Sequence, residues 1–204
     1  RGDSASRIKR NGAVVYESLL ENRTGRAILR ELEEMQLGHT LIACTKEAAM
    51  IKTDLSPEES AAVRRSYKKV VTVADFGSIE DDFIKITVRD MQERCIETAE
   101  KLAAFRNRAH IVASEKAWLD ITDLNVHKGS TVAHLQELLQ VTPEETMVFG
   151  DGMNDIEMMK SGRYSFAVRN AYPIIKDTAA FTTGRTNDED AVSHTILQLL
   201  ALQG

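Results

Sequence analysis

The feature that most constrains the fold is a regular alternation of amphipathic and apolar segments in the second half of the chain. Residues 130–140 carry apolar side chains at helical spacing, and residues 146–149 form a continuous apolar run. Further strand-like and helix-like segments alternate over residues 164–168, 172–177, 179–182 and 188–200. This order is typical of a parallel sheet with crossover helices, so we predict an α/β fold.

The first half of the chain has a different pattern, in which neighbouring strands stand between helices. Helices are expected over residues 24–37, with Gly38 at C′, over 57–67, and from a start at Asp90-x-x-Glu93 to about residue 105. Strands are expected over 39–45, 70–74, 83–88, 109–113 and 117–122, and the last two are close enough to pair. We therefore predict a separate α+β module.

Composition narrows the choice of partners. The 204 residues carry a net charge of −5 and no basic stripe, so a nucleic-acid partner has little support. No apolar run approaches the length of a membrane span, and we recognise no signal peptide. Cys44 and Cys95 lie in apolar surroundings and predict buried, reduced thiols in a cytoplasmic protein, with a disulfide as the less favoured alternative. Composition leaves the oligomeric state open.

Two aspartates follow the apolar run at 146–149, in the sequence Gly150-Asp151-Gly-Met-Asn154-Asp155. Ligands of such sheets bind beyond the carboxyl ends of the strands, where we expect both acids to face one point. Close carboxylates repel each other unless a cation neutralises them, and hard oxygen ligands favour Mg²⁺. Asn154 can donate its amide N–H to an anionic oxygen. The alternative, a plain turn with a capping side chain, is disfavoured by the preceding strand.

Lys128 precedes Gly129 and opens the helix before the acid-bearing strand. A lysine at this place can reach over the same edge of the sheet as a point charge for phosphate. Taken alone it fits a solvated surface lysine better, and only its spacing before Asp151 favours the functional interpretation.

Four ordered segments resemble the haloacid dehalogenase (HAD) superfamily, in particular its Cof-type phosphatases of subfamily IIB with a C2 cap. They cover about residues 109–204 and read Asn125-Val-His-Lys128-Gly129-Ser-Thr-Val, Val148-Phe-Gly-Asp151-Gly-Met-Asn154-Asp155-Ile-Glu-Met-Met, Ala167-Val-Arg-Asn170-Ala171 and Thr186-Asn187-Asp188-Glu189-Asp190-Ala-Val192. Residues 11–16 also resemble the segment that precedes the cap. A transport ATPase has a similar aspartate motif, but the absence of membrane spans argues against it.

The resemblance implies a fold, a domain organisation and an activity. The fold is a Rossmann-like HAD core with a parallel sheet and an inserted α/β cap of the C2 type. Residues 1–16 would be a remnant of the core, 17–122 the cap and 123–204 the C-terminal half of the core. The activity would be hydrolysis of a small phosphorylated metabolite, such as a sugar phosphate, through an aspartyl-phosphate intermediate.

The resemblance also implies roles for individual residues. Lys128 would be catalytic and would bind phosphate, and Asn154 would contact the phosphoryl oxygens. Asp151 and Asp155 would hold Mg²⁺. Asn170 would mark a possible edge of the site, next to an arginine where the family has glycine.

One family motif has no counterpart in the chain. The family's nucleophile stands in Asp-x-Asp-Gly-Thr after an apolar strand, and neither Asp3, Asp75 nor Asp120 fits this pattern. We expect the nucleophile upstream of residue 1, and the alternative is a non-catalytic binding or interaction protein with the same fold. Within the cap we interpret His39, Thr45, Lys46, Lys52 and Arg89 as surface residues rather than ligand contacts.

Overall fold

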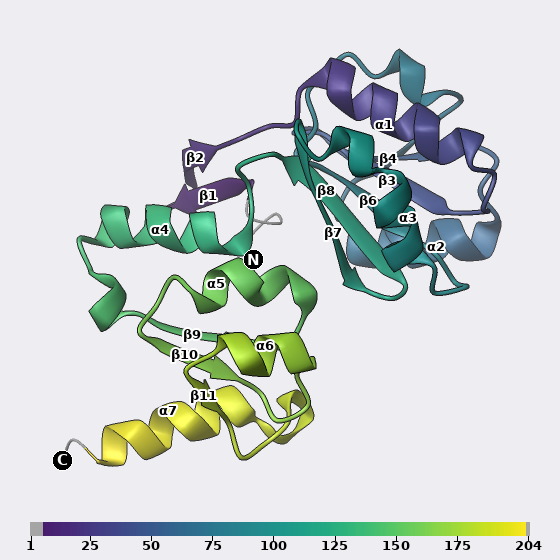
Figure 1. Ribbon diagram of the computed structural model, residues 1–204. Coiled ribbons are helices and arrows are strands. Elements are labelled where there is room, and N and C mark those ends of the chain that lie inside the picture. The colour runs from purple at the N-terminus through teal and green to yellow at the C-terminus, as the bar shows by residue number, and fades with distance from the viewer. Residues whose placement is uncertain (1–5, 203–204) are drawn as a thin grey trace. The chain divides into compact units, whose positions relative to one another are not determined.

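The computed structural model, shown in Figure 1, describes residues 6–202, and the chain divides into two compact units after Val126. The predicted α/β fold class is confirmed, because both units combine sheets with helices. The predicted boundaries after residues 16 and 122 stay predictions, and residues 1–5 of the predicted core remnant lie outside the described residues.

The first unit is built on a six-stranded sheet with the order β5-β4-β3-β6-β8-β7. All neighbours in this sheet are antiparallel except β4 and β5, and the predicted pairing of β7 with β8 is confirmed. The strands are β3 (Thr40–Cys44), β4 (Ala49–Lys52), β5 (Val70–Val73), β6 (Lys85–Arg89), β7 (Ala109–Glu115) and β8 (Trp118–Asp123).

Helices cover both faces of this sheet. Apolar residues of α1 (Asn22–Glu34) and α3 (Cys95–Lys101) pack with one face, and α2 (Pro57–Ser66) packs with the other. Alternate residues of β3 point into the two layers, which is why the whole strand is buried. Neither cysteine forms a disulfide within residues 6–202, and both are buried, as predicted.

The entry and exit of the first unit's sheet lie side by side. A hairpin of β1 (Arg7–Arg10) and β2 (Ala13–Glu17) leads into it, with Asn11 and Gly12 at positive φ in the turn. The Ser18 hydroxyl, just after the hairpin, donates a hydrogen bond of 2.6 Å to Asp123 at the end of β8. Residues 105 apart in sequence are thus joined where the chain enters and leaves.

Helix α1 ends earlier than the sequence predicts. Its cap residue is Met35, and Gln36 adopts the left-handed conformation with φ +49°, so Gln36 rather than Gly38 occupies C′. Gly38 has φ +69° and adds a second left-handed turn, after which the chain enters β3. The prediction of Gly38 at C′ was wrong because a non-glycine residue accepted the strained position.

The second unit has a parallel sheet with the order β11-β10-β9. Its strands are β9 (Met147–Gly150), β10 (Tyr164–Ala167) and β11 (Phe181–Thr182), and its helices are α4 (Lys128–Leu139), α5 (Ile156–Met159), α6 (Pro173–Thr178) and α7 (Ala191–Ala201). Within residues 6–202, β9 has a partner strand on one side only. None of the helices in this range has the length and apolar character needed to cross a membrane.

Candidate active site

The loop that carries both predicted acids begins where β9 ends. A Cβ atom added to Gly150 would lie 2.7 Å from Cβ of Asp155 and 2.7 Å from Cε of Met159, closer than real Cβ contacts allow. Glycine therefore lets the chain fold back over the end of the strand and bring Asp155 against it. The predicted placement of this acid at the carboxyl edge of the sheet follows from that close approach.

Asp155 is the buried centre of the loop, with a side chain that is 2% exposed. Its Oδ2 accepts hydrogen bonds from the backbone N–H groups of Asp151 and Gly152, at 2.9 and 3.0 Å. Its Oδ1 lies 2.5 Å from Nζ of Lys128. A buried carboxylate is stable only with such partners, so Asp155 both shapes the loop and fixes the lysine.

Lys128 reaches the loop from the first turn of α4. His127 caps the helix, and Gly129 lets it approach α5, because a Cβ there would lie 2.6 Å from the carbonyl oxygen of Glu157. Besides its ion pair, the ammonium group donates to Oδ1 of Asn154 at 3.2 Å. An ammonium group has three N–H donors. Since the side chain is 43% exposed, one donor is left for an anionic ligand.

Asn154 turns its carbonyl oxygen, rather than its amide nitrogen, toward Lys128. Within residues 6–202 its Nδ2 makes no hydrogen bond, so this group can still donate to an anion. The structure therefore adds a positioning contact that the sequence did not suggest.

Asp151 differs from Asp155 in being exposed. Its Oδ2 accepts a hydrogen bond of 3.2 Å from Nδ2 of Asn187. Asn187 in turn exchanges two hydrogen bonds with Asn170, at 2.8 and 3.2 Å. Asn170, the predicted site edge, thus reaches Asp151 through Asn187. The sequence contains Asn187 within a quoted motif, but sequence reasoning assigned it no role.

Arg169, which stands where the family has glycine, holds two loops together. Its guanidinium donates to the carbonyl oxygen of Gly184 at 3.1 Å and forms an ion pair of 2.8 Å with Glu189. The pKa of Glu189 lies below its usual value, first because of the backbone N–H of Thr186 and then because of Arg169. The arginine therefore has carboxylate and carbonyl partners within its own unit.

The carboxylate oxygens of this loop partly suit a hard cation such as Mg²⁺ as ligands. Oδ1 of Asp151 accepts no hydrogen bond from residues 6–202, whereas both oxygens of Asp155 already have partners. In the same range no third acidic, histidine or cysteine side chain joins them into a metal-ligating group. Mg²⁺ commonly binds one or two carboxylates and keeps several waters, so a two-carboxylate site is compatible with it.

The loop after β9 carries Asp151 and Asp155, and Lys128 of α4 is bonded to Asp155. The chain is thus an α/β protein with a charged site at the carboxyl edge of its parallel sheet. A model of the haloacid dehalogenase-like hydrolase family matches residues 6–196. The chain therefore belongs to the haloacid dehalogenase-like hydrolase family, and the resemblance seen in its sequence is confirmed.

Individual relatives agree with this assignment. The chain is 28% identical over 151 residues to the 5-amino-6-(5-phospho-D-ribitylamino)uracil phosphatase YbjI of Escherichia coli (strain K12). The aligned residues cover 73% of this chain and 55% of that protein. A crystal structure from Streptococcus mutans UA159 has a TM-score of 0.89 at 24% identity, over 97% of this chain and 75% of that one. An HAD subclass IIB sugar phosphatase has a TM-score of 0.77 at 20% identity, over 96% and 73%. The chain spans about half the length of the curated relatives it matches.

Proposed function

We propose that the chain is part of a Mg²⁺-dependent phosphatase that hydrolyses a small phosphorylated metabolite, such as a sugar phosphate. The observation that carries this proposal is the Lys128–Asp155 ion pair beside the exposed carboxylate of Asp151. It joins a fixed cation for phosphate to one free carboxylate oxygen for a metal, Oδ1 of Asp151. The phosphatase relative named above supports a phosphorylated metabolite as the substrate.

The chain's own residues would stabilise charge on the transferring phosphoryl group. The remaining N–H donor of Lys128 would bind one phosphoryl oxygen, and the amide N–H of Asn154 would bind a second. Asp155 would act by holding the lysine in place. Because this arrangement exists before a substrate arrives, little reorganisation is needed as charge develops, which is the main source of catalysis in phosphoryl transfer.

Asp151 and Asp155 would hold the Mg²⁺ ion. When bound, the ion supplies positive charge that neutralises and orients the phosphoryl oxygens. Asp151 offers a carboxylate oxygen directly, and the buried Asp155 presents its charge from beneath the loop. Asn187 would keep Asp151 turned toward the site through its hydrogen bond.

The proposal includes an aspartate nucleophile that lies outside these 204 residues and forms the aspartyl-phosphate intermediate. It also includes a cytoplasmic location, which the two cysteines without a disulfide favour because cytoplasmic proteins keep thiols reduced. The 204-residue chain alone is then expected to show no turnover.

The test uses the protein expressed from its full reading frame, assayed with p-nitrophenyl phosphate in Mg²⁺ and in EDTA. We expect Mg²⁺-dependent hydrolysis, and Asp151→Asn should lower kcat by about 100-fold or more, as loss of a key charge at such sites does. The matched control is Asp188→Asn, an exposed aspartate on the same unit. Because Asp151 is exposed, its variant should stay folded.

Two outcomes would decide against parts of the proposal. Unchanged activity in Asp151→Asn would reject the site. Absence of Mg²⁺-dependent turnover in the full-length protein would favour the second candidate, a non-catalytic binding protein of the same fold, which the lack of an Asp-x-Asp-Gly-Thr motif in this chain also suggests.

A further inference from the structure

Three polar side chains at the carboxyl edge of the parallel sheet come from three successive loops. Asp151 follows β9, Asn170 lies in the loop after β10, and Asn187 begins the short helical turn Asn187–Glu189 after β11. The carboxyl ends of parallel strands meet at one edge, which brings the first and last of these loops together. Both asparagines are therefore placed to act on the carboxylate of Asp151.

The hydrogen bonds between the two asparagines fix how each amide is turned. Nδ2 of Asn170 donates to Oδ1 of Asn187 at 2.8 Å, and the backbone N–H of Asn187 donates to Oδ1 of Asn170 at 3.2 Å. With its oxygen bound in this way, Asn187 turns its NH₂ group toward Asp151, and Nδ2 lies 3.2 Å from Oδ2. The pair thus offers the carboxylate a donor rather than an acceptor.

The backbone around this pair is held by further bonds. The N–H of Arg169 donates to the carbonyl oxygen of Arg185 at 3.0 Å, and its guanidinium is paired with Glu189 at 2.8 Å. The carbonyl oxygen of Asp151 accepts from the N–H of Tyr172 at 3.1 Å. Since these bonds fix the loops, the remaining freedom of the aspartate lies in its side chain, which the asparagine amide restrains.

Neither aspartate of the site offers two free oxygens. Oδ2 of Asp151 accepts from Asn187, whereas Oδ1 accepts no hydrogen bond from residues 6–202. Asp155 has its Oδ1 on Lys128 and its Oδ2 on two backbone N–H groups. A bidentate carboxylate must turn both oxygens toward one ion, which competes with these donors. The residues present therefore favour a metal bound through a single oxygen of Asp151.

This arrangement discriminates between divalent ions. Mg²⁺ demands near-octahedral geometry and keeps several waters, whereas Ca²⁺ takes about six to eight oxygen ligands and often both oxygens of a carboxylate. We propose that Asn187, held by Asn170, is a specificity-determining residue that makes the site favour Mg²⁺ over Ca²⁺ by keeping Asp151 monodentate. This role rests on the proposed phosphatase site and adds to it the residue that selects the metal.

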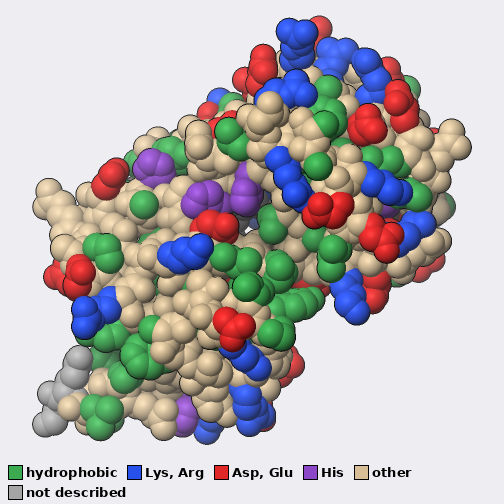
Figure 2. All heavy atoms as spheres, viewed as in Figure 1, with side chains coloured by type: hydrophobic (Ala, Val, Ile, Leu, Met, Phe, Trp, Pro, Cys, Tyr) green, Lys and Arg blue, Asp and Glu red, His purple; other side chains and the backbone are tan. Residues whose placement is uncertain are grey.

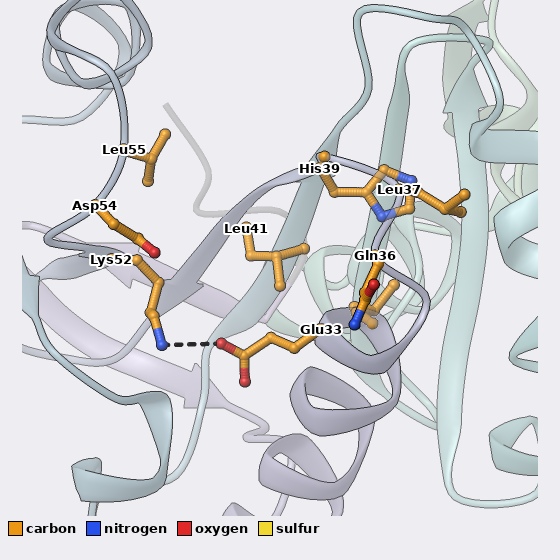
Figure 3. Close-up of a pocket in the computed structure, with 10 residues that line it drawn as sticks. Glu33, Gln36, Leu37, His39, Leu41, Lys52, Asp54 and Leu55 are labelled. Atoms are coloured by element: carbon orange, nitrogen blue, oxygen red, sulfur yellow. Dashed lines mark ion pairs between the residues drawn. The ribbon is translucent and has the colours of Figure 1, made fainter.

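A cavity of about 270 Å³ in the first unit, shown in Figure 3, is a poor place for a divalent cation. Its wall contains Glu33 and Asp54, but Glu33 is paired with Lys52 at 3.1 Å, and that ammonium group repels a second cation. His39 of the same wall was wrongly expected at the surface. Its side chain is only 2% exposed because it packs against Asp90, and its Nδ1 is buried, so it is not available as a ligand.

The test compares the dissociation constants of Mg²⁺ and Ca²⁺, measured by isothermal titration calorimetry on the protein expressed from its full reading frame. Asn187→Leu keeps the size of the side chain but removes its amide, which frees Oδ2 of Asp151 for Ca²⁺. We expect the ratio of the Ca²⁺ to the Mg²⁺ dissociation constant to fall about tenfold, as loss of a hydrogen bond to a charged group predicts. Asn170→Leu leaves the donor of Asn187 without support and should lower the ratio by less.

The matched control is Asn107→Leu, which changes an exposed asparagine of the first unit and should leave the ratio unchanged. A purely structural role of Asn187 would weaken both ions equally. An unchanged ratio in Asn187→Leu would therefore overturn the proposal, even where the native protein hydrolyses p-nitrophenyl phosphate with Mg²⁺. Binding of neither ion by the native protein would reject the metal site of the proposed function and this role with it. A crystal structure with Ca²⁺ on both oxygens of Asp151 and the bond from Asn187 intact would also contradict the proposal.

Discussion

At the scale of single residues, Asp90 shows how burial and hydrogen bonding act together. The residue is 1% exposed, and Arg94 binds both of its oxygens, at 2.7 and 3.1 Å. The backbone N–H of Gln92 adds a bond of 2.9 Å. Together these donors, the Arg94 side chain first, lower the pKa of Asp90 to about 2. The same carboxylate has Oδ2 3.6 Å from Nε2 of His39.

This shift predicts a loss of stability in acid. The folded protein holds Asp90 ionised, whereas an unfolded aspartate titrates near pH 3.9. The stabilisation is thus present above about pH 4, is lost as the pH falls toward 2, and amounts to about 2 kcal/mol. Urea unfolding of the native chain and of Asp90→Asn should show a difference in unfolding free energy that shrinks by that amount between pH 5 and pH 2.5. A difference that stays constant over this range would contradict the prediction.

At the scale of elements, the contact between α4 and α5 sets the position of Lys128. Gly129 allows the backbones to approach, as its missing side chain leaves room for the carbonyl of Glu157. We expect Gly129→Ala to destabilise the fold by about 1–3 kcal/mol, because a rigid backbone atom must move. Gly184→Ala is the control, since nothing lies within 4 Å of the added atom and φ is not positive. Chemical denaturation of both variants measures the difference, and equal stabilities would contradict this account.

Elements with strong local signals could be predicted from the sequence. The helix expected over residues 57–67 begins as predicted, with the Ser56 hydroxyl accepting from the N–H of Glu59, and β9 lies within one residue of its predicted range. The strand β4 was not predicted, because its four residues have no distinctive pattern, although it pairs with the neighbouring strand β3 as well as with β5. Helix α5 is a single short turn of four residues, too short to show a helical pattern in the sequence.

In the candidate site, too, contacts within a recognisable sequence motif could be predicted, whereas contacts between separate segments could not. The motif places Lys128, Asn154 and Asp155 together because 26 and 27 residues of regular strand and helix separate the lysine from its partners. The contact of Asn187 with Asp151, over 36 residues of loops and short elements, could not be inferred. The burial of His39 was also missed, because it depends on packing between segments far apart in the sequence.

At the scale of the whole molecule, exposed apolar side chains are concentrated in the second unit. Figure 2 shows hydrophobic groups at the surface over α7. Along this helix Leu197 and Leu200 are 66% and 58% exposed, and Leu139 on α4 is 59% exposed. Apolar surface of this extent marks contact regions or sites of aggregation. The open side of β9 adds a row of backbone groups without strand partners in the described residues.

We therefore expect the 204-residue chain to associate with itself as its concentration rises. The double variant Leu197→Lys and Leu200→Lys should reduce this association, because charges on the helix surface oppose contact. The control, Met91→Lys with Ile96→Lys, places the same charges on exposed apolar positions of the first unit. Sedimentation velocity at several concentrations measures the effect, and an equal reduction by both pairs would show that α7 is not the region responsible.

The hydrogen bond between Ser18 and Asp123 has a consequence for how such a chain can be rearranged. Because the side chains at the two ends of the intervening segment are joined by a hydrogen bond of 2.6 Å, a linker of a few residues can bridge the backbone gap between them. The segment that forms the six-stranded sheet and its helices can therefore be replaced as one unit, because its two ends are adjacent. A gene could lose it, or accept another in its place, while the flanking polypeptide keeps its path.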